Sequence, residues 1–218
     1  MKTRTLVQEI SIVVVGAINK EQCNPLWLVK HNVISEDDVR SIDNNSLVIS
    51  KDLVKFRTQQ LEVLCDGERL QLRSKDISLS NKLSCVVKGI LDCCGCKASA
   101  IGINAMMRIS FLNDTDFLRF NHHIAPLDGL SPLSPNALLS NITVSDWSEK
   151  EGNGTPKKTF NIQRIRNFEN NNAAVQISMN AHYTIETDSL AVDNTLANAA
   201  NVQSLFFMNA QKLLDSIK

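Results

Sequence analysis

Three cysteines at 93, 94 and 96 form the densest group of reactive side chains in the sequence. Thiolates can ligate zinc or take part in redox chemistry. A structural zinc site usually needs four ligands in paired Cys-x₂₋₄-Cys or His spacings, and no second pair follows at such a spacing. The pattern therefore favours small thiols packed at the end of a helix, with a metal or redox role as the alternatives. We predict that these thiols are reduced and metal-free.

His122 and His123 are a second candidate, close to Asp114 and Asp116 in the sequence. Adjacent histidines point in different directions, whereas a chelating pair on a helix needs a spacing of four. An acid–base or metal site is conceivable here, but surface histidines and polar capping fit the pattern better. Together with Asn104 and Arg108, the two histidines define a candidate polar site for an enzyme or a small-ligand-binding protein.

Motifs that specify common chemistries are absent from the sequence. It has no Gly-x-Ser-x-Gly elbow, no Gly-x-Gly-x-x-Gly and no Walker loop. We therefore predict no catalytic, cofactor-binding or metal residue and no cofactor, and we favour a protein that is not an enzyme.

The charge pattern disfavours nucleic-acid and membrane partners. Lys and Arg number 23 and Asp and Glu also number 23, so no basic bias attracts phosphates. The apolar run near residues 10–17 is short and better suits a buried strand than a signal peptide. No segment reaches the length of a membrane span. Six cysteines, mostly on predicted helices or strands, suit a reducing compartment, so we expect a cytoplasmic location.

Hydrophobic periodicity predicts the elements that would position these residues. Residues 80–94 carry apolar side chains at helical spacing, and Gly95 follows as a helix stop. Residues 99–111 alternate cleanly between apolar and other side chains, as in a strand with one wet face. Asp66-Gly67 between two strand-like runs predicts a hairpin with a type I′ turn. Further strands are expected at the following ranges: 9–16, 46–50, 137–145, 158–168 and 173–185.

These elements predict an α+β fold. We expect one mainly antiparallel sheet of about seven or eight strands, with two principal helices, 80–94 and 194–217, packed on one face. The chain should form a single domain, 1–218, whose halves 1–123 and 137–218 are joined by a proline-rich connector.

The C-terminal helix is apolar on two sides. We expect one stripe to pack on the sheet, namely Val202, Leu205, Phe206, Leu213 and Ile217. A second stripe of Ala200, Phe207 and Leu214 is predicted to contact another surface, most simply a second copy of the chain. The alternative is a curled sheet that buries both stripes within one subunit.

Several short motifs in this order resemble a group of uncharacterised bacterial proteins of similar length. They are Asn24-Pro25-Leu26-Trp27, Ala100-Ile-Gly-Ile-Asn104, His123-Ile-Ala-Pro126 and Asn180-Ala-His-Tyr183. The resemblance implies a bacterial protein with one whole-chain domain, and no activity.

Two functions follow from these patterns. The first is a non-enzymatic interaction or assembly subunit that acts through its C-terminal helix or a sheet face, with a protein partner or a homo-oligomer. The second is an enzyme or ligand-binding protein with a site near the half-polar sheet face and the connector 121–136.

Overall fold

The computed structural model describes residues 1–126, 138–146, 155–166, 173–185 and 189–217. Most of the predicted proline-rich connector lies outside these ranges.

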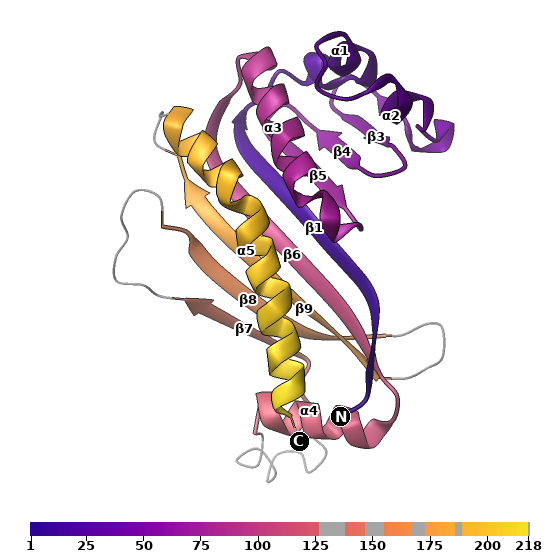
Figure 1. Cartoon of the computed structure of the whole chain (residues 1–218), viewed down its shortest axis with the longest axis vertical. Helices are drawn as coiled ribbons and strands as arrows, with labels where there is room; N and C mark the ends of the chain where they lie inside the picture. Colours follow the sequence, from indigo (N-terminus) through magenta and orange to yellow (C-terminus); the bar gives the residue numbers. More distant parts are fainter. Residues whose placement is uncertain (127–137, 147–154, 167–172, 186–188, 218) are drawn as a thin grey trace.

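In the described residues, nine strands form one antiparallel sheet in the order β2-β3-β4-β5-β1-β6-β9-β8-β7 (Figure 1). The strands are β1 (Thr3–Ala17), β2 (Val48–Ile49), β3 (Val54–Arg57), β4 (Glu62–Cys65), β5 (Arg69–Ser74), β6 (Lys97–Phe111), β7 (Asn141–Asp146), β8 (Lys157–Arg166) and β9 (Ala173–Thr184). The α+β prediction is confirmed. The strand that the sequence patterns missed is β3, which is short and has only two buried apolar side chains, Val54 and Phe56.

The two long helices, α3 and α5, lie on the same side of the sheet, which we call the inner face (Figure 1). The other side is called the open face. The helices are α1 (Pro25–Lys30), α2 (Glu36–Arg40), α3 (Ser80–Cys94), α4 (Asp114–Ile124) and α5 (Ser189–Ser216), with short 3₁₀ turns η1 (Lys20–Cys23), η2 (Asn44–Ser46) and η3 (Ile77–Leu79). No helix in the described ranges combines the length and the apolar character that crossing a bilayer requires.

The centre of the sheet is the long pairing of β1 with β6. Alternate side chains of these strands point to the inner face and are almost completely buried: Ile10, Ile12, Val14, Ile101, Ile103, Ala105, Met107, Ile109 and Phe111. The intervening residues on β6, such as Asn104 and Arg108, lie on the open face and are half-buried or exposed except for Ser110 near the end of the strand, which is buried. The alternation predicted for residues 99–111 is confirmed.

Helix α3 ends where the sequence predicts. Gly95 caps it in the left-handed region at φ 58°, a conformation that glycine adopts without steric cost. Leu83, Val87 and Ile90 are fully buried against the sheet, so the helix is a core element as expected.

The β4–β5 hairpin also forms, but its turn differs from the prediction. Gly67 has positive φ, whereas Asp66 does not, so the turn is not type I′. Instead, the Asp66 carboxylate accepts the backbone N–H groups of Glu68 and Arg69 at 3.1 and 2.8 Å. The Asp66 N–H also donates to the Arg69 backbone oxygen at 3.1 Å, so the central residues of the turn are Gly67 and Glu68, and only Gly67 has positive φ.

A buried amide joins both helices to the centre of the sheet. Gln203 of α5 is 1% exposed, and its nitrogen donates to the backbone oxygens of Ser11 on β1 (3.3 Å) and Asn104 on β6 (3.1 Å). Its side-chain oxygen accepts a hydrogen bond from the Ser80 hydroxyl at the start of α3. Each polar atom of this side chain is therefore paired, as a buried amide requires, and α5 is held at a defined position along the sheet.

Candidate functional site

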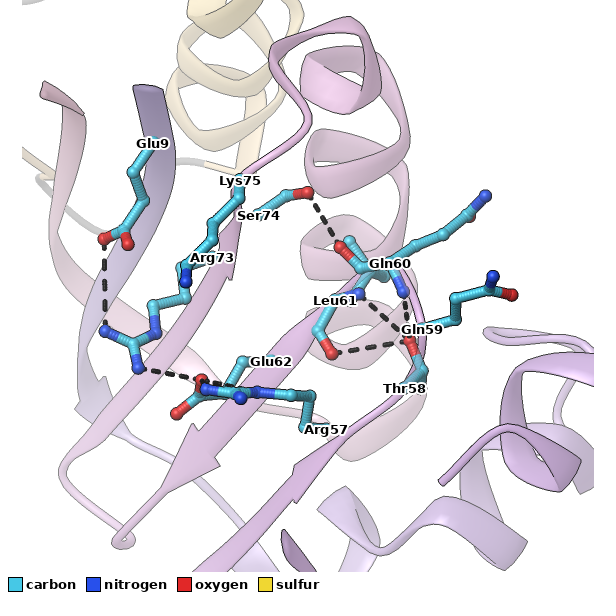
Figure 2. A pocket seen from close by; sticks show the side chains of 10 residues that line it. All are labelled: Glu9, Arg57, Thr58, Gln59, Gln60, Leu61, Glu62, Arg73, Ser74 and Lys75. Atoms are coloured by element: carbon cyan, nitrogen blue, oxygen red, sulfur yellow. Dashed lines mark hydrogen bonds and ion pairs between the residues drawn. The ribbon is translucent and has the colours of Figure 1, made fainter. Parts of the chain in front are cut away.

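Two regions of the described surface stand out: a charged pocket on the open face, and an uncovered apolar area beside α5. The pocket has a volume of about 240 Å³ and opens to solvent (Figure 2). It is lined by Glu9, Arg57, Thr58, Gln59, Gln60, Leu61, Glu62, Arg73, Ser74 and Lys75.

Strand register brings the charged residues of the pocket together. Arg57 on β3 is paired with Glu62 on β4, and Glu62 is paired in turn with Arg73 on β5. Since cross-strand partners point to the same face, the three side chains form a row. Glu9 on β1 extends this row, with its carboxylate 4.0 Å from Arg73 Nη1.

Glu62 is the hub of the row. Its Oε2 accepts hydrogen bonds from Arg57 Nη2 at 2.7 Å, Arg57 Nε at 3.2 Å and Arg73 Nη2 at 2.8 Å. Lys55 Nζ lies 3.6 Å from its other oxygen. The Glu62 side chain is only 9% exposed, whereas the side chains of Arg57 and Arg73 are 55% and 38% exposed. Burial opposes ionisation of Glu62, but the hydrogen bonds from the two arginines outweigh it and hold the pKa of Glu62 below its usual value.

The rim of the pocket is fixed by hydrogen bonds. The Thr58 hydroxyl accepts the N–H groups of Gln60 and Leu61 at 3.2 and 3.0 Å, which closes the tight β3–β4 turn. The Ser74 hydroxyl donates to the Gln60 backbone oxygen at 2.7 Å. The turn is thereby fastened to the end of β5, so the pocket has a defined shape.

The residues of the predicted polar site do not line this pocket. Asn104 and Arg108 lie on the open face of β6, where Asn104 donates to the Gly102 backbone oxygen and Arg108 to Gln176. His122 and His123 are exposed on the last turn of α4.

Asp116, which lies near the histidines in the sequence, has a structural role. Its carboxylate accepts the Lys2 backbone N–H at 3.0 Å and the Asn113 amide at 3.1 Å. This aspartate therefore fixes the start of β1 to α4.

The folded chain adds two cysteines to the group that the sequence shows. Cys94 and Cys96 lie near Cys23 of η1 and Cys65 of β4, which are fully buried. Burial and the neighbouring thiols raise the pKa of Cys94 to about 12, and hydrogen bonding with Cys65, together with burial, also raises the pKa of Cys23. The same Cys23 contact lowers the pKa of Cys65.

All six cysteines are free thiols. No group of three or more His, Cys, Asp or Glu side chains within the described ranges is placed to hold a metal ion. A raised pKa keeps Cys23 and Cys94 protonated at neutral pH, so they are poor nucleophiles. The sequence patterns missed Cys23 and Cys65 because the tertiary packing of η1, β4 and the end of α3, not sequence spacing, brings them to this cluster.

The second region involves α5, where two stripe assignments need correction. Leu214, predicted to face outward, is 5% exposed and packs inside the chain. Leu205, predicted to face the sheet, is 43% exposed. Ala200 and Phe207 are half-buried, and Phe207 contacts the core. Helix α3 covers one flank of α5 along its first half, from the Lys88–Asp193 ion pair to the Ser80–Gln203 hydrogen bond. Leu214 lies further along α5, where its side chain belongs to the buried core.

The opposite flank of α5 faces β9. Asn198 hydrogen-bonds Tyr183 of β9 on this flank, and Leu205 follows Asn198 by seven residues, which places it on the same side of the helix. Helix α5 packs on β6 and β9, and Figure 1 shows that the start of β8 and the end of β7 extend beyond α5 on the side away from α3.

The apolar rows of the inner face nevertheless continue onto β8 and β7. Met179 of β9 is paired with Phe160 of β8, and Phe160 with Val144 of β7. The exposed fraction rises along this row: Met179 is 4% exposed, Phe160 is half-buried and Val144 is 54% exposed. We call the surface formed by Ile142, Val144, Phe160, Ile162 and Leu205 the apolar ledge.

No protein family has a model that matches the chain, and no curated protein matches it.

Proposed function

We propose that this protein is a non-enzymatic assembly subunit that associates with a second copy of itself through the apolar ledge. The observation that carries the proposal is the extension of the inner apolar rows beyond α5 onto β8 and β7, where side chains such as Val144 are exposed. A contiguous apolar surface of this kind is typical of a protein–protein contact.

A second copy suits this surface because β7 is an edge strand. Within the described residues nothing pairs with its outer side. Its sequence, Asn141-Ile-Thr-Val-Ser-Asp146, contains no proline and one charge, so little opposes pairing with another strand. Packing of two ledges face to face about a two-fold axis would bury both apolar surfaces and place the two β7 edges in the contact.

The test replaces exposed ledge residues by glutamate. Val144→Glu and Leu205→Glu should fold, because both side chains reach solvent in the single chain. In the dimer each glutamate would be buried without a partner. We expect a dimer for the unchanged protein and at least a tenfold weaker association for each variant, which corresponds to about 1.4 kcal/mol. Sedimentation velocity over a concentration series, with circular dichroism as the folding check, measures both.

Leu26→Glu is the matched control, since Leu26 is 75% exposed on α1, far from the ledge. This variant should associate like the unchanged protein. The proposal would be contradicted if the unchanged protein were a monomer at every concentration. It would also be contradicted if the Val144→Glu, Leu205→Glu and Leu26→Glu variants associated equally strongly.

We also infer a cytoplasmic setting for this subunit. The support is that all six cysteines are free thiols and that two of them, Cys23 and Cys65, are fully buried. The cytoplasm keeps thiols of this kind reduced.

A further inference from the structure

We propose that the pocket between Arg57, Arg73 and Lys75 is a binding site for the carboxylate or phosphate group of a small ligand. This inference is independent of the apolar ledge, because the pocket lies on the open face, opposite α3 and α5. Its volume of about 240 Å³ suits a small molecule.

The first argument is that two guanidinium groups are held side by side. Arg57 and Arg73 both donate to the same oxygen of Glu62, at 2.7 and 2.8 Å from their Nη2 atoms. Two like charges separate unless a group between them holds them, and the buried Glu62 carboxylate does so. The arginines are therefore oriented before any ligand arrives, which lowers the entropic cost of binding.

The second argument is the donors that remain. Glu62 engages Nε and Nη2 of Arg57, and Arg57 Nη1 has no partner among the described residues. Arg73 Nη1 has only Glu9 at 4.0 Å, and Lys75 makes no ion pair within the described part of the chain. A guanidinium presents N–H groups in a fork that matches the two oxygens of a carboxylate or phosphate.

The third argument is the local charge. Three cations, Arg57, Arg73 and Lys75, line the pocket with two carboxylates, Glu9 and Glu62, so the lining itself has a positive charge in a protein with no net charge. Asp43 acts on Arg57 from outside the lining. Glu62 is a positioning residue in this site, since it acts by orienting the arginines. Figure 2 shows Arg57 and Arg73 reaching Glu62 from two different strands.

The experiment titrates the whole chain with inorganic phosphate and, separately, with succinate, and follows the arginine side-chain N–H signals by NMR. Sodium chloride at matched ionic strength is the reference for non-specific screening. We expect one or both probes to shift the Arg57 and Arg73 signals beyond the chloride effect, with a dissociation constant of about 1 mM or tighter. A response to phosphate alone assigns a phosphorylated ligand, a response to succinate alone assigns a carboxylic acid, and a response to both assigns the shared oxyanion chemistry.

Variants connect the response to the pocket. Arg57→Gln should weaken probe binding about tenfold. Lys75→Gln, which leaves the Glu62 ion pairs intact, should weaken binding severalfold without any effect on folding. Arg40→Gln is the control, because Arg40 is 73% exposed and its ion pairs among the described residues are with Glu36 and Asp37 of its own helix. No shift beyond chloride with either probe, or an equal affinity in Arg57→Gln, Lys75→Gln and Arg40→Gln, would overturn the proposal.

Discussion

At the scale of single residues, the side chains with the most reactive chemistry do not lie where the surroundings favour a reaction. Cys93, Cys94 and Cys96 are the densest group along the chain, yet burial keeps Cys94 protonated. The charged group with defined geometry is centred on Glu62, whose partners come from β3 and β5. No short motif marks this group, because residues separated in sequence meet through strand register.

Glu62 should make the stability of the protein depend on pH. Its pKa is lower in the folded chain than in the unfolded chain, so its contribution is fully present above the unfolded value of about 4.3. That contribution is lost as the pH falls through the lower folded value. Glu62→Gln should therefore lower the free energy of unfolding by about 1–2 kcal/mol at neutral pH, because Arg57 and Arg73 lose their charged acceptor. The difference in stability between variant and unchanged protein should begin to narrow below the unfolded pKa and should close once the pH is below the folded pKa of Glu62.

Urea unfolding at a series of pH values measures this gap. Glu36→Gln serves as the control, because Glu36 forms an exposed ion pair within α2 and such pairs contribute little. A gap that stays constant from neutral to acid pH would show that Glu62 does not act through its charge.

At the scale of elements, local patterns predicted the helices and long strands well. The period of apolar residues and the terminal glycine located α3, and strict alternation located β6. The two stripes of α5 were harder to assign, since Leu205 and Leu214 are equally apolar. Which of them is buried depends on how the rest of the chain packs around α5, and the sequence of α5 alone does not determine that packing.

The core role of α3 predicts a large effect from a single truncation. Ile90 is fully buried, so Ile90→Ala should lower the free energy of unfolding by about 2–5 kcal/mol through lost contacts and a cavity. Cys85→Ala, on the exposed side of the same helix, should change it by less than about 0.5 kcal/mol. The urea midpoints of the two variants compare these effects, provided that the dependence of the free energy of unfolding on urea is the same in both. Equal midpoints would argue against the position of α3 on the sheet.

At the scale of the whole molecule, the sequence predicted a mostly antiparallel sheet with helices on one face, and the structure agrees. The order of the strands could not be predicted from the sequence, because tertiary packing decides which strands pair. Both surfaces proposed as functional depend on that order. The pocket needs β3, β4, β5 and β1 as neighbours, and the ledge needs β8 and β7 beyond the reach of α5.

The strand order also predicts a gradient of hydrogen exchange. Backbone amides of β1 and β6 are paired on both sides and covered by helices, so they should open only on global unfolding. Amides of β7, at the edge, should exchange much faster. Hydrogen–deuterium exchange read by mass spectrometry resolves this difference, and uniform protection across the sheet would contradict a central β1–β6 pair with β7 at the edge.

The position of β1 between β5 and β6 has a consequence for how the chain folds. This strand leaves the ribosome before the other eight but lies at the middle of the sheet, where it pairs with two strands made later. Until β6 has been synthesised, the backbone of β1 is unpaired along one edge. The apolar side chains of the strand, Ile10, Ile12 and Val14, are then not yet covered. Pairing between strands far apart in the sequence slows folding, and an unpaired apolar strand invites aggregation during that interval. We therefore expect a chaperone that binds extended apolar segments to bind the nascent chain at the β1 segment.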